Sequence, residues 1–192
     1  LGRPLGSAFP SPNAPREIEV DRLSMSFSGE YNNGFNWDLS YTNSSDSSFG
    51  RQPDTSTSRF SAAIAGTAGP SGNLSWNLFD PSANSQELID YISTAQETSI
   101  STDLSVLDYV VTGSLGSTNI AAGLQFRDET FDIKRNAESL AQFTADGSIA
   151  VPADLLFLGG GLESEASRNA KAVFVEASNQ YSDQLEVRAA LR

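Results

Sequence analysis

The sequence of 192 residues contains neither cysteine nor histidine. This excludes Ser-His-Asp and Cys-His catalytic sites and removes most ligands of transition metals, so we expect no enzyme. Without cysteine, the redox compartment stays undefined. No run of about 18 apolar residues occurs, which excludes a membrane-spanning helix. A membrane-spanning strand needs only about 9–11 residues with one apolar face, so the sequence does not exclude such strands.

Positive charge is also scarce. The sequence has 12 Lys and Arg residues and 24 Asp and Glu residues, so its net charge is −12. This balance disfavours binding to nucleic acid or to an anionic lipid surface. The chain starts with a Gly/Pro-rich stretch in place of an initiator Met or a signal-peptide pattern, and it stops inside an alternating run. We therefore expect a fragment of a longer protein.

The stretch from Phe35 to Thr42 alternates large apolar or aromatic side chains with small polar ones. On a strand, such alternation creates one apolar face and one polar face. Phe35, Trp37, Leu39 and Tyr41 share the predicted apolar face, and Asn36, Asp38, Ser40 and Thr42 the polar face. Leu23, Met25 and Phe27 alternate with serines in the preceding run, and Asn32-Asn33-Gly34 has the chemistry of a hairpin turn between the two runs.

The alternation continues along the chain and predicts six strands. Some runs are less regular: Val106 and Val110 fall on the polar side of the third, and the phase of the fifth is ambiguous at Ala172 to Val175. The fourth run continues into a charged extension, Asp128 to Arg135. The predicted strands cover residues 17–30, 35–43, 102–115, 119–127 with its extension, 169–178 and 184–192.

Two long intervals, residues 44–101 and 136–168, separate the three predicted hairpins. Residues 1–16 carry four prolines and predict an exposed loop, and the polar stretch 44–58 predicts another. Residues 59–66 fit a strand or a short helix, and the i,i+4 spacing of Phe60 and Ile64 favours a helix ended by Gly66. Ser85 is a predicted N-cap for a helix that reaches about Glu97.

The connections alternate strictly between short turns, near residues 31–34, 116–118 and 179–183, and the two long intervals. This asymmetry is typical of outer-membrane barrels with short periplasmic turns and long extracellular loops. We therefore predict an all-β chain: an antiparallel, up-and-down transmembrane β-barrel segment of about six strands, with short helices in its long loops. A secreted β-sandwich stays open as an alternative, because its strands also have one apolar face.

Several segments resemble the barrel domain of TonB-dependent outer-membrane receptors. The carrying stretches are residues 2–16, 34–42, 53–60, 122–129 and 172–192. The resemblance implies a barrel of 22 strands, with an N-terminal plug that this chain does not contain. It further implies import of a scarce nutrient, such as a siderophore, a vitamin, a saccharide or a peptide, with energy from TonB and its inner-membrane complex. Implied partners are the ligand, outer-membrane lipid and TonB; a passive porin-like barrel and a secreted binding module remain alternatives.

Trp76, Phe79 and Tyr91 lie in the first long interval and are candidate ligand contacts, with packing as the alternative role. Asp128, Glu129 and Asp132 cluster like glycosidase carboxylates, although a solvated strand extension explains them as well. Asp80, Asp90, Glu163 and Glu165 are acidic loop residues, but their spacing matches no calcium-loop signature. We predict no catalytic residues, no cofactor and no metal site.

Overall fold

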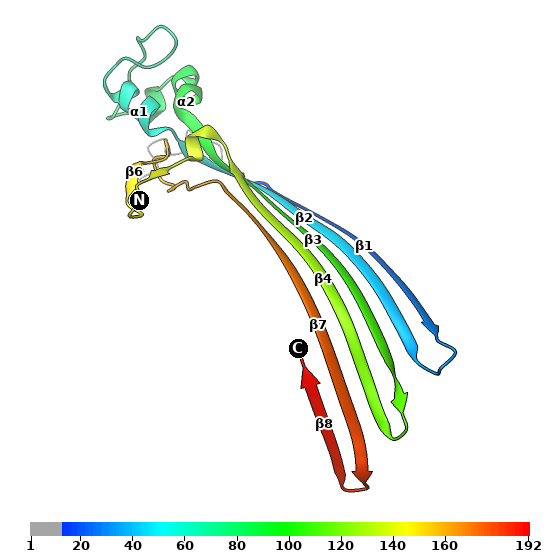
Figure 1. Cartoon of the computed structure of the whole chain (residues 1–192). Helices are drawn as coiled ribbons and strands as arrows, with labels where there is room; N and C mark the ends of the chain where they lie inside the picture. Colours follow the sequence, from blue (N-terminus) through cyan, green and yellow to red (C-terminus); the bar gives the residue numbers. More distant parts are fainter. Residues whose placement is uncertain (1–12) are drawn as a thin grey trace. The chain divides into compact units, whose positions relative to one another are not determined.

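A computed structural model describes residues 13–192 as a mostly antiparallel β-sheet with two short helices (Figure 1). Six strands form one sheet in the order β1-β2-β3-β4-β7-β8. Their bounds are β1 Arg16–Glu30, β2 Asn36–Thr55, β3 Ser93–Leu115, β4 Thr118–Arg135, β7 Ser164–Ser182 and β8 Leu185–Leu191. The prediction of six strands in hairpins is confirmed.

The remaining elements are short and lie in the two long connections. The first connection contains α1 Thr57–Ile64, the 3-10 turn η2 Pro81–Ala83 and α2 Gln86–Ile92. The second contains the 3-10 turn η3 Ala137–Ser139, β5 Gln142–Phe143 and β6 Ile149–Val151. β5 and β6 pair antiparallel as a separate two-stranded sheet.

The chain divides into two compact units. The sheet unit comprises Glu19–Ser47, Ser101–Asp132 and Glu165–Arg192. The loop unit comprises, among the described residues, 13–18, Ser48–Ile100 and Ile133–Ser164. Strands β1, β2, β3, β4 and β7 therefore contribute residues to both units.

Short and long connections alternate as predicted. Residues 31–35, 116–117 and 183–184 join adjacent strands, whereas residues 56–92 and 136–163 form the long connections. Gly34 and Gly116 take positive φ values of 81° and 65° in two of the short turns. That conformation is easily reached by glycine, so the turn chemistry read from the sequence is correct.

The predicted loop at residues 44–58 is wrong. β2 continues through this polar stretch to Thr55, and β3 begins at Ser93 instead of Thr102. β2 lies between two strands, so its backbone groups find partners on both sides even where neither face is apolar. An ion pair between Arg51 of β2 and Glu97 of β3, at 3.0 Å, joins the two extensions.

Two more boundaries are corrected. α2 ends at Ile92 and does not reach Glu97, because Ser93 takes an extended conformation and its Oγ donates to the Ile89 carbonyl at 2.6 Å. β7 starts at Ser164, five residues before the predicted start. The N-cap at Ser85 and the helix near Arg59 are confirmed. Of the predicted loop at 1–16, residues 13–15 form no strand or helix, Arg16 belongs to β1, and residues 1–12 lie outside the described part.

The loop unit has two small apolar cores. The first belongs to the first connection and contains Trp76, Leu88, Ile89, Ile92 and two alanines, with Phe60 and Tyr91 packed at its edge. The second contains Ala141, Ala153 and Leu155, with Leu158 against it, and belongs to the second connection alone. The two connections thus build their apolar cores separately.

Candidate functional site

One face of the sheet unit exposes a row of large apolar side chains. Within residues 13–192 no second layer buries them, although a soluble sheet buries such a face against another element. We call this the apolar face. Its exposed members include Leu23, Met25, Phe27, Leu107, Leu115, Leu124, Phe126, Val173, Val175, Leu185, Val187 and Leu191.

The register of the last hairpin supports the assignment of faces. Val175 is paired with Leu191 and Asn179 with Val187, whereas Ser178 is paired with Arg188 and Gln180 with Glu186. Residues directly opposite each other in an antiparallel pair point to the same face. β7 and β8 therefore place apolar and charged side chains on opposite faces, as the sequence predicts for β8.

Aromatic rings cover glycines on neighbouring strands at three places in the sheet unit. Trp37 lies against Gly29 and Phe35 against Gly113, all on the apolar face. Phe174 lies against Gly123 on the opposite face. The last contact resolves the ambiguous phase of β7, since it places Phe174 on the polar face and leaves Val173 and Val175 on the apolar face.

The opposite, polar face carries hydrogen bonds and ion pairs between strands. Gln125 donates to Asp108 at 2.7 Å, and the hydroxyls of Ser24 and Thr42 lie 2.9 Å apart. Glu129 forms ion pairs with Arg127 and with Arg168, the latter at 2.6 Å. This face is therefore suited to contact with water or with polar ligands.

A shallow depression on the sheet, of about 450 Å³, adjoins the Glu129–Arg168 ion pair. It is lined by residues 102–104, 129–131 and 166–168. Sequence reasoning missed it, because it forms only where β3, β4 and β7 lie together.

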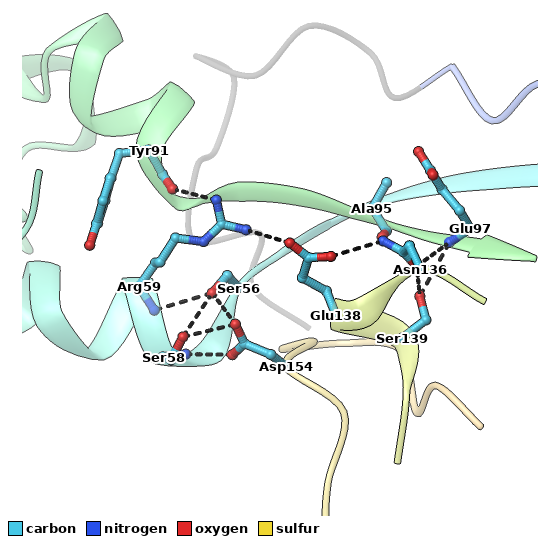
Figure 2. A network of polar contacts seen from close by, with 10 residues as sticks. All are labelled: Ser56, Ser58, Arg59, Tyr91, Ala95, Glu97, Asn136, Glu138, Ser139 and Asp154. Atoms are coloured by element: carbon cyan, nitrogen blue, oxygen red, sulfur yellow. Dashed lines mark hydrogen bonds and ion pairs between the residues drawn. The ribbon is translucent and has the colours of Figure 1, made fainter. Parts of the chain in front are cut away.

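Side chains of the second connection bind the start of α1 in the loop unit (Figure 2). The Asp154 carboxylate accepts hydrogen bonds from the Ser56 hydroxyl at 2.5 Å, and from the backbone N–H and hydroxyl of Ser58 at 2.7 and 2.8 Å. Ser56 is also the N-cap of α1, accepting from the Arg59 N–H. Desolvation raises the pKa of Asp154, but these hydrogen bonds outweigh it and hold the pKa below its ordinary value.

Asp54, at the end of β2, ties the second connection to that strand. Its side chain is only 5% exposed and accepts from the backbone N–H of Leu158 at 2.8 Å and of Phe157 at 3.2 Å. The Leu156 N–H donates to the Thr55 carbonyl at 2.9 Å. A buried carboxylate needs such hydrogen-bond donors. Asp54 therefore holds the backbone of residues 157 and 158 in a fixed conformation against the end of β2.

Arg59 and Asn136 extend this polar contact (Figure 2). The Arg59 guanidinium lies 3.6 Å from Glu138 and donates to the Tyr91 carbonyl at 3.1 Å. Asn136 donates to the Ala95 carbonyl at 2.9 Å and accepts from the Glu97 N–H at 3.0 Å. The two apolar cores are thus bridged by a network of polar contacts, which we call the polar bridge (Asp54, Ser56, Ser58, Arg59, Asn136, Glu138, Ser139 and Asp154).

The three predicted ligand contacts have different surroundings. Trp76 is 8% exposed and packs edge-on against Phe60, with ring centroids 5.5 Å apart. Tyr91 packs partly buried at the edge of the same core. Phe79 is 99% exposed. Packing is therefore the observed role of Trp76 and Tyr91, and ligand contact by any of the three stays a prediction.

Five of the other acidic candidates have separate partners. Asp128 accepts from Asn169, whereas Glu129 pairs with arginines. Asp80 accepts from Ser82, Asp90 from Gln86 and Glu163 from the Arg135 N–H. Among residues 13–192, no group of three or more side chains is arranged to hold a metal ion.

Comparison with protein-family models finds no match, and comparison with curated protein sequences finds none either. None of the helices in the described part of the chain is long and apolar enough to cross a membrane.

Proposed function

We propose that this chain is part of the β-barrel domain of an outer-membrane receptor, which takes up a scarce nutrient with TonB-derived energy. The observation that carries the barrel proposal is the apolar face of the sheet unit. Its side chains are exposed, while the opposite face bears Asp, Glu, Arg and Ser side chains. Lipid on one side and a watery lumen on the other account for both faces.

The length of the apolar band supports this proposal. On β3, alternate residues from Leu107 to Leu115 are apolar or glycine, and on β4 the band extends from Ile120 to Phe126. These lengths approach the roughly 9–11 residues that a tilted strand needs to cross the hydrocarbon core. Beyond them the apolar face becomes polar, with Asn43 donating to Ser105 and Thr130 to Asp103.

The connections support the same orientation. Turns of two to five residues would lie on the periplasmic side, and connections 56–92 and 136–163 would form the outer loops. The folded loop unit would then be extracellular, where it can contact a nutrient. Further strands, outside this sheet, would pair with the edges of β1 and β8 and close a barrel of 22 strands.

The receptor activity rests on the family resemblance, because the sheet alone fits a passive porin-like barrel equally well. A plug upstream of this chain and uptake that requires TonB would distinguish the receptor from the porin. A secreted β-sandwich is less well supported, since a sandwich covers its apolar faces with each other. The depression lined by Arg168 on the polar face offers a site for a polar ligand.

Membrane fractionation tests the barrel proposal. The intact protein, expressed in its source cells, should remain in outer membranes after carbonate washing and should migrate differently on gels when heated. Release as a soluble protein contradicts it. Uptake of candidate nutrients in cells with and without TonB then tests the receptor activity: equal uptake in both supports the passive barrel.

A further inference from the structure

The segment from Asn77 to Asn84 in the loop unit presents two apolar side chains to solvent. Leu78 is 63% exposed and Phe79 is 99% exposed, the highest value among the exposed large apolar residues. A single exposed leucine is ordinary, whereas a fully exposed phenylalanine beside it is not explained by folding of this chain. We call residues 77–84 the apolar tip.

The conformation of the apolar tip is held by its own polar side chains. The Asn77 carbonyl oxygen Oδ1 accepts from the N–H groups of Phe79 at 3.0 Å and Asp80 at 2.9 Å. Asn84 Oδ1 accepts from the Asn77 N–H at 2.7 Å, and Asp80 accepts from the Ser82 N–H at 3.0 Å. These bonds form a closed turn beneath Leu78 and Phe79.

Both ends of the apolar tip are anchored. Trp76, immediately before it, is buried in the first core. Ser85, immediately after it, caps α2 through a bond from the Leu88 N–H. The tip is therefore pre-organised, and a partner that binds it would lose little conformational entropy in ordering it.

The sequence stretch that contains the tip carries acidic side chains and no basic ones, which disfavours two kinds of partner. From Phe60 to Phe126 the sequence contains no Lys or Arg. The acidic residues nearest in sequence are Asp80 in the tip, and Glu87 and Asp90 on α2. An anionic lipid surface would be repelled, and a second copy meeting the same segment would bring like charges together.

We propose that the apolar tip is a docking element for another protein, whose binding surface is an apolar socket rimmed by Lys and Arg. Phe79 fills the socket, and the acidic residues on α2 face the basic rim. Aromatic anchors surrounded by complementary charge are typical of interaction hot spots. This proposal does not depend on the barrel or on nutrient uptake.

Photo-crosslinking from position 79 tests the proposal in the intact protein and its own cells. Benzoylphenylalanine replaces Phe79. In the control it replaces Ser71, an exposed residue of the same loop unit that lies between Pro70 and Gly72. We expect one protein adduct specific to position 79, mapped by mass spectrometry to an apolar site flanked by Lys or Arg. Adducts to lipid or to the chain itself, or no adduct beyond the control, overturn the proposal.

Binding of the purified partner provides the second measurement. Phe79→Ser should weaken binding about tenfold or more, as at a hot spot, whereas Phe79→Leu should weaken it less. Glu87→Lys should slow association and reduce its salt dependence, because it removes charge complementarity. Hydrogen exchange of α1 and α2 shows that each variant is folded. A folded Phe79→Ser variant that binds as well as the original protein overturns the proposal.

Discussion

The indole ring of Trp37 lies over Gly29 of the adjacent strand. A Cβ atom at Gly29 would be 2.8 Å from the ring atoms Cε2, Cζ2 and Nε1, closer than real Cβ atoms approach such neighbours. A side chain at this position must therefore displace the ring. The pair joins β1 to β2 on the apolar face, next to the first short turn.

Gly29→Ala should move the Trp37 ring and destabilise this hairpin by about 1 kcal/mol, because the added methyl overpacks the contact. Trp37 and Trp76 are the two tryptophans, so Trp76→Phe provides a background in which fluorescence reports Trp37 alone. The matched control is Gly50→Ala on β2, where an added Cβ meets nothing within 4 Å. An unchanged emission spectrum in Gly29→Ala contradicts this contact.

Asp154→Asn should loosen the start of α1. The neutral amide cannot reproduce three hydrogen bonds accepted by a carboxylate, and the expected loss in the free energy of unfolding is about 1–3 kcal/mol. Faster hydrogen exchange of the α1 amides would measure it. The control is Asp146→Asn, in the turn between β5 and β6, where the carboxylate binds Thr144 and Ser148 instead of α1. Equal effects of both variants on α1 would contradict the role of Asp154.

The polar bridge should also weaken in acid. Because the pKa of folded Asp154 lies below the ordinary value of 3.8, its carboxylate stabilises the loop unit above about that pH. This stabilisation is lost as the pH falls further and the carboxylate takes up a proton. Hydrogen exchange of α1 followed downward from pH 5 should show the loss, and Asp154→Asn should flatten the profile. An Asp154→Asn profile as steep as that of the original protein would exclude this residue as the cause.

Truncation of Trp76 should destabilise the loop unit strongly, whereas truncation of Phe79 should hardly affect it. Trp76→Ala removes a buried ring from the first core and should lower the free energy of unfolding by about 3–5 kcal/mol. Phe79→Ala should change it by less than about 0.5 kcal/mol, because its side chain is exposed. Chemical denaturation, with hydrogen exchange of α2 as the readout for the loop unit, measures both changes in the free energy of unfolding. Comparable losses would contradict the placement of Phe79.

The two faces of β4 provide a test of the lipid proposal. Leu124→Arg on the apolar face should impair insertion of the intact protein by about 2–4 kcal/mol, if this position lies near the centre of the bilayer. Gln125→Arg, one residue away on the polar face, should insert normally. Folding yield into lipid vesicles compares the two variants. Equal yields would argue against lipid at the apolar face.

The hairpins were predictable because their signals are local. Alternation on residues 23–27 and 35–42 determines which side chains share a face, and Asn-Gly chemistry determines the turn between them. Ser85 as an N-cap is local too, since its side chain bonds a backbone N–H three residues ahead. The polar extension of β2 to Thr55 gave no such signal, because its pairing depends on strands that arrive from elsewhere in the chain.

The candidate contacts show the same division. Trp76 and Phe79 are both aromatic residues of one polar interval, and their sequence neighbourhood does not distinguish them. One is buried against Phe60, and the other is held outward by a turn built on Asn77. The polar bridge could not be predicted from the sequence, because Asp154 lies 98 positions from Ser56, its hydrogen-bond partner.

The sequence by itself determined that Trp37 belongs to a strand with one apolar and one polar face, because side-chain direction alternates along any extended backbone. It also determined the order of short turns and long connections. The tertiary structure decided how far the strands extend, where Trp37 rests, and how two separate loop cores are bridged by Asp54 and Asp154. Those outcomes depend on hydrogen bonds and close contacts between residues far apart in the chain, which no local pattern encodes.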